Sequence, residues 1–82
     1  MNNKVLVEII VPKVDARFSV FLPVTKKIGN IVELLNKAIF ELDNSHTDAG
    51  SVLYNWETGK KYEVDVLLYN TDIRSGVALV LF

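Results

Sequence analysis

The amino-acid sequence predicts an α+β domain of two layers, in which one helix packs on a five-stranded mixed sheet. Two observations lead to this prediction. Apolar residues recur at helical intervals in the middle of the chain, and segments rich in β-branched residues lie on both sides of that stretch. The apolar stripe of such a helix must be buried against the sheet. A chain of 82 residues is long enough for one domain but not for two, so we expect a single domain over residues 1–82.

The first two strands are predicted to form a hairpin. Residues 5–11 are rich in β-branched side chains and end at Pro12, which is typical of a strand. Residues 17–22 alternate between apolar positions and their neighbours, so that Phe18 and Val20 share one face. The link between the two segments is short, which favours an antiparallel hairpin.

The central helix is predicted from a stripe of apolar residues spaced three and four positions apart. Thr25, which follows Pro23, is the best N-cap candidate because its hydroxyl could accept a hydrogen bond from the first turn. A polar loop over residues 43–50 ends the helix. The stripe consists of Ile28, Ile31, Val32, Leu35, Ala38, Ile39 and Leu42.

The second half of the chain is predicted to supply three strands. Residues 52–56 form the third strand, with its even-numbered side chains facing the helix, and residues 61–64 return as a short fourth strand. Leu68 and Ile73 anchor the polar segment that follows. Residues 77–82 are apolar on both faces, which favours a central position in the sheet. The predicted order is ββαββ, then a turn, then a final strand.

The composition argues against several functions. Nine basic residues against ten acidic ones leave no basic field that would attract nucleic acid or a membrane surface. The absence of cysteine excludes disulfides, thiolate catalysis and cysteine-ligated metals. No apolar run approaches the ~18 residues that span a bilayer. The run at residues 5–11 is interrupted by Glu8 and lacks a cleavage site, unlike a signal peptide. We therefore expect a cytoplasmic protein.

The sequence offers no convincing catalytic or metal-binding group. His46 is the only histidine and is flanked by Asp43 and Asp48, so it could act as a metal ligand or a general base. A lone histidine in a polar loop is more often solvated, and the two aspartates lack the spacing of a calcium loop. We therefore expect no catalytic residue, no metal and no cofactor, and predict that the protein is not an enzyme.

The aromatic residues of the second half allow two interpretations. Tyr54, Trp56 and Tyr62 could form a platform on which single-stranded nucleic acid stacks. That mode needs a basic groove, and Lys60 and Lys61 alone do not make one. We favour the interpretation in which these aromatic residues complete the core, and we expect no nucleic-acid partner.

The order of several motifs resembles the ubiquitin family. Residues 68–81 carry the pattern Leu-x-x-x-x-Ile-x-x-Gly-x-x-Leu-x-Leu, which is similar to the family's core-sealing C-terminal segment. Ile28, Ile31 and Leu35 match the spacing of its core-facing helix residues, and Gly59-Lys60 stands where the family has a tight Gly-Lys turn. This resemblance implies the ubiquitin-like, or β-grasp, fold for nearly the whole chain.

Within that superfamily the chain resembles the small YukD/EsaB-type proteins, which are encoded beside type VII (WXG100-type) secretion systems of Gram-positive bacteria. The likeness rests on similar length, on the Leu22-Pro23 step into the helix and on a chain that stops at the last strand. It implies an accessory or regulatory protein whose partner is a membrane-associated secretion component. The alternative is a small structural ubiquitin-like subunit of a multicomponent enzyme, such as a bacterial monooxygenase.

The end of the chain departs from ubiquitin itself. The sequence stops at Phe82, with no flexible tail and no Gly-Gly. Conjugation and sulfur-carrier chemistry activate a C-terminal glycine carboxylate, so we expect a non-conjugating protein.

One face of the predicted sheet carries more apolar side chains than a two-layer domain can bury. Strand alternation places this candidate protein-binding patch on the side away from the helix, and a large exposed apolar patch usually marks an interaction site. Glu8, Arg17 and Glu63 are expected to form its polar rim. The alternatives are ordinary exposed apolar surface or a homodimer that covers the face. The patch residues are Leu6, Ile10, Phe21, Leu53, Val80 and Phe82, with Ala78 beside them.

Overall fold

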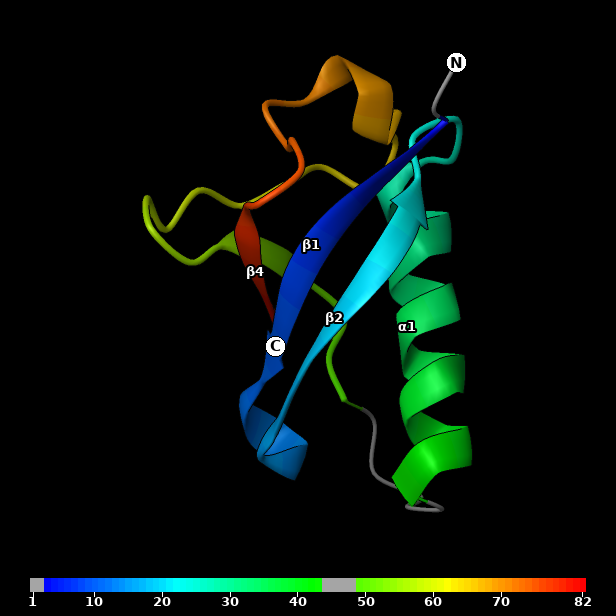
Figure 1. The fold of residues 1–82 in the computed structure, drawn as a ribbon, viewed down its shortest axis with the longest axis vertical. Helices are drawn as coiled ribbons and strands as arrows, with labels where there is room; N and C mark the ends of the chain where they lie inside the picture. The colour runs from blue at the N-terminus through cyan, green and yellow to red at the C-terminus, as the bar shows by residue number, and fades with distance from the viewer. Residues whose placement is uncertain (1–2, 44–48) are drawn as a thin grey trace.

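The computed structural model describes residues 3–43 and 49–82, which form an α+β domain (Figure 1). The predicted class, one helix and a mixed sheet, is confirmed. In chain order the elements are β1 (Lys4–Val11), the 3₁₀ turn η1 (Pro12–Val14), β2 (Ala16–Pro23), α1 (Ile28–Asp43), β3 (Leu53–Asn55), the 3₁₀ turn η2 (Leu68–Asn70) and β4 (Ala78–Leu81).

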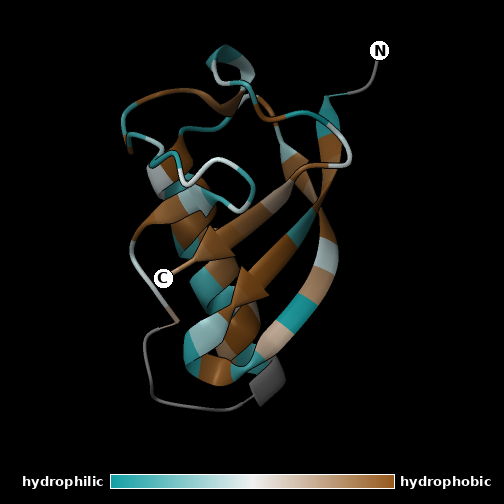
Figure 2. Ribbon diagram, turned by 90° about the vertical axis from the view of Figure 1, so that its left-hand side faces the viewer, coloured by the Kyte–Doolittle hydropathy of each residue, from teal (hydrophilic) through white to brown (hydrophobic). Residues whose placement is uncertain are grey.

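The sheet has four strands in the order β2-β1-β4-β3. β1 pairs antiparallel with β2 and parallel with β4, and β3 pairs antiparallel with β4. The predicted central position of the last strand is confirmed, because β4 lies between β1 and β3. In Figure 2 the strand that runs to the label C is hydrophobic along its length, as expected of a strand with neighbours on both sides.

The first hairpin is also confirmed. Its pairing runs without interruption from Lys4 opposite Pro23 to Val11 opposite Ala16. The turn between the strands closes at Asp15, which has the left-handed φ of 52° and donates its backbone N–H to the carbonyl oxygen of Pro12 at 3.2 Å. Aspartate tolerates this conformation better than most residues.

The apolar stripe of α1 packs on the sheet as predicted over most of its length. Its buried members are Ile28, Ile31, Val32, Leu35 and Ile39. Ala38, which was expected in the stripe, is exposed, because it lies at the edge of the helical arc that faces the sheet. The side chain of Leu42 falls outside the described residues.

The start of α1 differs from the prediction. The helix begins at Ile28, three residues beyond Thr25, so no threonine hydroxyl caps it. Two backbone carbonyls take that role. The N–H groups of Ile28 and Gly29 donate to the oxygens of Val66 and Val64, at 2.9 and 3.0 Å. These donors have no partner within the helix itself, and the approach of the 64–66 segment satisfies them.

Gly29 allows this close approach. A Cβ atom at this position would lie 3.3 Å from both the Cβ and the carbonyl oxygen of Val64. The glycine therefore costs helix propensity but lets the capping segment lie directly against the first helical turn.

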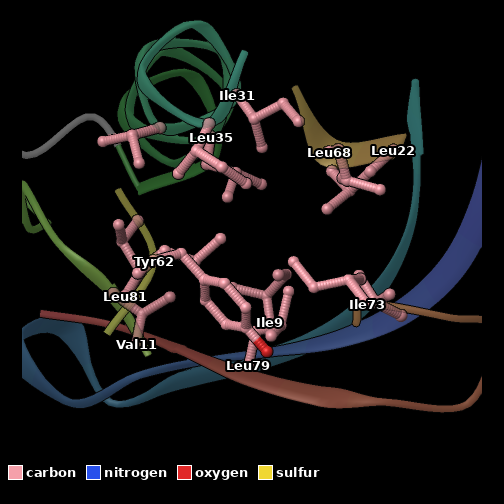
Figure 3. Packing of buried hydrophobic residues seen from close by; sticks show 14 of the residues in the cluster. Ile9, Val11, Leu22, Ile31, Leu35, Tyr62, Leu68, Ile73, Leu79 and Leu81 are labelled. Atoms are coloured by element: carbon pink, nitrogen blue, oxygen red, sulfur yellow. The ribbon is translucent and has the colours of Figure 1, made fainter. Parts of the chain in front are cut away.

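The buried residues form one core cluster between α1 and the sheet (Figure 3). The predicted anchors Leu68 and Ile73 are both buried in it. In Figure 3 the Tyr62 ring lies among the aliphatic side chains, with its hydroxyl at the margin of the cluster. Besides the five helix residues, the core consists of Val7, Ile9, Val11, Leu22, Ala49, Leu53, Tyr62, Leu68, Ile73, Leu79 and Leu81.

The third strand faces the opposite way from the prediction. Leu53 is 0% exposed and pairs with the equally buried Leu81, whereas Tyr54 pairs with Val80 on the other face. Trp56, predicted to face the helix, is 62% exposed. A slip of one residue exchanges the two faces of a strand. Residues 52–54 are all apolar, so the alternation in sequence could not decide between the two registers.

The predicted fourth strand over residues 61–64 does not form. After β3 the chain turns back and pairs with β3 at one isolated β-bridge, between Lys61 and Tyr54. Next to this bridge, the Tyr62 N–H donates to the Leu53 carbonyl oxygen at 3.0 Å. The chain then leaves the sheet, because the carbonyls of Val64 and Val66 turn to the N-terminus of α1. The sheet of the described residues therefore has four strands and not five.

The observed register of β3 makes a testable prediction. Leu53→Ala is expected to lower the free energy of unfolding by about 2–5 kcal/mol, because it opens a cavity in a fully buried position. The matched change Val52→Ala, at a half-buried position, should cost only about 1 kcal/mol. Urea unfolding followed by circular dichroism measures both. Equal losses, or a larger loss for Val52→Ala, would contradict the register.

Candidate functional site

The face of the sheet turned away from α1, the open face, holds most of the predicted patch. Leu6, Phe21 and Phe82 are 41%, 59% and 54% exposed, and Ile10 and Val80 are half-buried. These five residues therefore lie at the surface, as predicted. Leu53 does not belong to the patch, because its side chain lies in the core on the opposite face.

Cross-strand neighbours divide the open face into two apolar areas. Leu6 lies opposite Phe21 at one end of the β1–β2 hairpin. Further along β1, Ile10 pairs with Val80, and Val80 pairs in turn with Tyr54 on β3. The second area is thus a row that crosses three strands, and Tyr54 replaces Leu53 as the contribution of β3.

An ion pair separates the two areas. Glu8 lies between Leu6 and Ile10 along β1, and its carboxylate binds the Arg17 guanidinium through two hydrogen bonds of 2.9 Å. These bonds lower the pKa of Glu8 and raise that of Arg17. The pair was expected at the rim of the patch. The ion pair instead crosses the middle of the patch, because Glu8 lies on β1, an inner strand of the sheet. Glu63, the third residue predicted at the rim, lies in the 61–64 segment that leaves the sheet.

A lysine partly covers the end of the patch. The Nζ atom of Lys13, on η1, lies 5.2 Å from the centroid of the Phe82 ring. A cation over the ring face at this distance is attracted by the ring's quadrupole. The open face therefore combines apolar side chains with cationic groups and a carboxylate.

A second exposed apolar group was not foreseen from the sequence. Val64 and Leu67 border an open cleft of about 560 Å³ at the first turn of α1. Its polar lining carries both signs of charge, from Lys26 and Lys27 and from Glu33 and Asp65. The sequence signal for it is the apolar character of Val64, Val66 and Leu67, which lie where the sequence predicts the end of a strand and a turn.

A polar network fixes Tyr62 at the edge of the core. Its hydroxyl donates to Asp72 Oδ1 at 2.7 Å and accepts from Asn55 Nδ2 at 3.2 Å. Lys60 Nζ lies 3.7 Å from the other oxygen of Asp72. Burial raises the pKa of Tyr62, and the hydrogen bond from Tyr62 lowers the pKa of Asp72.

Neither interpretation of the aromatic residues holds for all three rings. Tyr62 is buried, Tyr54 is half-buried on the open face and Trp56 is exposed. The three rings therefore do not form one stacking platform, and only Tyr62 completes the core.

Residues considered for chemistry give no site in the described part of the chain. His46 and Asp48 lie outside the described residues, as does the side chain of Asp43. Within residues 3–43 and 49–82 no three histidine, cysteine or acidic side chains gather in a way that could hold a metal ion. No helix in the same residues has the length and apolar character needed to cross a membrane.

Comparison with known proteins yields structural matches alone. No protein-family profile and no curated protein sequence matches the chain. A chain of the MycP5-free ESX-5 inner membrane complex, in State II, is similar to 99% of this chain with a TM-score of 0.70 and 16% sequence identity. The present chain spans 21% of the length of that chain. A designed protein based on ubiquitin is similar over 100% of this chain and 90% of its own, with a TM-score of 0.67 and 17% identity.

These likenesses define the fold. The one-helix, mixed-sheet arrangement with a central C-terminal strand is ubiquitin-like, as the motif order of the sequence implied. The same fold forms part of a chain in an ESX-5 secretion complex.

The polar network around Tyr62 predicts a loss of stability at high pH. The pKa of Tyr62 in the folded state is raised above its ordinary value of 10.0. The contribution of the neutral Tyr62 side chain to the free energy of unfolding is therefore fully present below about pH 10. It is lost as the pH rises through the folded pKa. Urea unfolding at a series of pH values should show this fall.

The substitution Tyr62→Phe isolates the effect. It should cost about 1 kcal/mol at neutral pH and flatten the alkaline fall, whereas Tyr69→Phe, at an exposed position, should leave the fall unchanged. An alkaline fall that persists in Tyr62→Phe would refute the assignment.

Proposed function

We propose that this chain is a non-catalytic protein-interaction module and serves as an accessory or regulatory component of a bacterial type VII secretion system. The observation that supports this most directly is the likeness of 99% of the chain to part of a chain of the ESX-5 inner membrane complex. A domain of this shape is therefore used inside a secretion assembly. The YukD/EsaB-like features of the sequence point to the same setting, with the protein acting in the cytoplasm.

The open face is the surface that would bind the partner. Three of its large apolar side chains, Leu6, Phe21 and Phe82, are at least two-fifths exposed, and exposed apolar side chains gathered on one face commonly mark an interaction surface. Burial of this face against a partner would supply part of a standard interface, which is about 800 Å² per partner.

The chemistry of the open face favours a protein partner over a membrane or a nucleic acid. The chain as a whole has a net charge of −1, and on the open face Arg17 is paired with Glu8 and Lys13 lies over the Phe82 ring, so there is no extended basic field to attract phosphates. The Glu8–Arg17 pair lies between two apolar areas, and such an ion pair can exchange hydrogen bonds with polar groups of a protein at an otherwise apolar contact. A membrane-associated secretion component would meet these requirements.

Substitutions on the open face test the proposal. Leu6→Asp and Val80→Asp should weaken binding at least tenfold, since each places a charge in the buried part of the interface. Leu34→Asp, at an exposed position of α1, is the matched control and should bind like the wild type. The measurement is affinity capture by the intact protein from bacteria that carry a type VII secretion locus, followed by mass spectrometry.

We expect the wild type and the Leu34→Asp variant to capture a secretion-system component. The two open-face variants, Leu6→Asp and Val80→Asp, should not capture it. Circular dichroism confirms that each variant is folded. Undiminished capture by Leu6→Asp and Val80→Asp would exclude the open face. If the proteins that are captured through the open face include no component of the secretion system, the secretion role is refuted.

A further inference from the structure

The outer edge of β2 is the longest unpaired backbone edge of the sheet. β2 has eight residues and stands at one end of the strand order, with β1 as its single neighbour. At the other end, β3 has three residues. Within residues 3–43 and 49–82 no backbone hydrogen bond reaches β2 from its outer side. Such an edge offers a ready template for another strand.

The pairing pattern shows which backbone groups point outward. Val24 donates its N–H to the carbonyl oxygen of Asn3 at 2.9 Å, and hydrogen-bonded pairs alternate along an antiparallel ladder. The even-numbered residues of β2 therefore bond to β1. The N–H and C=O groups of Arg17, Ser19 and Phe21 point away from the sheet.

The pairing of β1 with its other neighbour is consistent with this alternation. Leu6 accepts from the Gly76 N–H at 2.9 Å, and Glu8 donates to the Val77 oxygen at 3.1 Å. The even-numbered residues of β1 thus bond toward β4, which leaves its odd-numbered residues to bond to β2.

β2 carries few of the features that normally block an edge. Proteins protect such strands with lysines, prolines, bulges or a covering segment. The register of β2 with β1 is continuous, so no bulge interrupts it. Its one charged side chain, Arg17, is engaged by Glu8, and Pro23 stands at its last position. Ser19, at the middle of the edge, is unprotected.

We infer that the edge of β2 pairs antiparallel with β2 of a second copy of this chain, around a two-fold axis at Ser19. Ser19 then lies opposite Ser19 of the second copy, and each Arg17 lies opposite Phe21 of the other chain. These are three hydrogen-bonded residue pairs, and each exchanges two backbone hydrogen bonds. The edge is self-complementary, as a two-fold interface requires.

The side chains fit this register on both faces of the strand. On the open face, each guanidinium stands beside an aromatic ring, which favours a cation–π contact. On the face toward α1, Phe18 lies opposite Val20 of the second copy, and aromatic with β-branched pairs stabilise antiparallel strands. Phe18 and Val20 are half-buried in the single chain, so pairing would cover what they still expose.

Neighbouring registers fit less well. An axis at Arg17 sets two like charges opposite each other. An axis between Ser19 and Phe21 places Pro23, which has no N–H, opposite Arg17. An axis at Phe18 brings Phe21 opposite Asp15, whose N–H is already used in the turn to Pro12. The axis at Ser19 is the register that keeps all three outward-facing residues paired.

The pairing goes beyond the proposed function and uses the backbone edge of β2, which borders the open face at Arg17 and Phe21. A two-fold axis perpendicular to the sheet keeps both open faces on the same side of the dimer. Two copies would therefore present two docking surfaces to one partner assembly, which raises the effective affinity without any new contact to the partner.

Light scattering or sedimentation equilibrium of the purified protein tests the pairing over a range from about 1 μM to about 1 mM, which covers weak to moderate dimers. The wild type is expected to form dimers. Ser19→Pro should raise the dissociation constant at least tenfold, because it removes an outward N–H while the ladder to β1 stays intact. Ser19→Ala, which keeps the N–H, should dimerise like the wild type.

Crosslinking provides a second measurement. The chain contains no cysteine, so a single introduced thiol reports one position. Ser19→Cys should form a disulfide-linked dimer under mild oxidation, since hydrogen-bonded partners stand about 5.5 Å apart at Cα, within the range that a disulfide spans. Thr58→Cys, in an exposed turn, should crosslink at least tenfold more slowly.

Three results would overturn the inference. One is a wild type that stays monomeric at every concentration, and another is Ser19→Cys that crosslinks no faster than Thr58→Cys. The third is a dimer that persists in the Ser19→Pro variant but dissociates in the Val80→Asp variant. That result would place the contact between the two copies on the open face. Loss of partner capture by Val80→Asp with the dimer retained would support both this inference and the proposed function.

Discussion

The parallel pairing of β4 with β1 is the contact on which the rest of the structure depends. It joins the two ends of the chain, with Ile9 beside Leu79, and both residues are completely buried. β2 is attached to one side of this pair and β3 to the other. The continuous apolar surface of the two inner strands is what α1 covers, so the helix, the core and the open face all take their positions from it.

The segment between β3 and β4 serves the core in a different way. Leu68 and Ile73 fill the core, and the carbonyls of Val64 and Val66 complete the hydrogen bonding of the first turn of α1. In a longer β-hairpin these carbonyl groups would accept hydrogen bonds from a neighbouring strand. Here they accept hydrogen bonds from the N-terminus of α1 instead. This explains why the sheet gains no strand here and why Val64 and Leu67 are left at the surface.

The two surfaces considered for binding follow from this architecture. A single helix covers one face of the sheet, so Leu6, Phe21, Val80 and Phe82 remain on the open face. The Glu8–Arg17 pair spans the first hairpin and adds a polar contact within that face. The edge of β2 is the second surface and is made of backbone groups. The first is suited to a partner with a complementary apolar surface, and the second to another strand.

The sequence by itself determined the elements with strong periodicity: the first hairpin, the helical stripe from Ile28 to Ile39, and the central position of the last strand. Their side-chain patterns encode burial directly.

Tertiary structure alone decided the facing of Leu53, the loss of the 61–64 strand and the capping of α1. In each case several local choices were nearly equal in energy. The apolar run at residues 52–54 fits either register, and Thr25 could have capped a helix that began earlier. Contacts with residues distant in the chain, Leu81 for β3 and Val64 for α1, settled the outcome, and a local pattern cannot contain them.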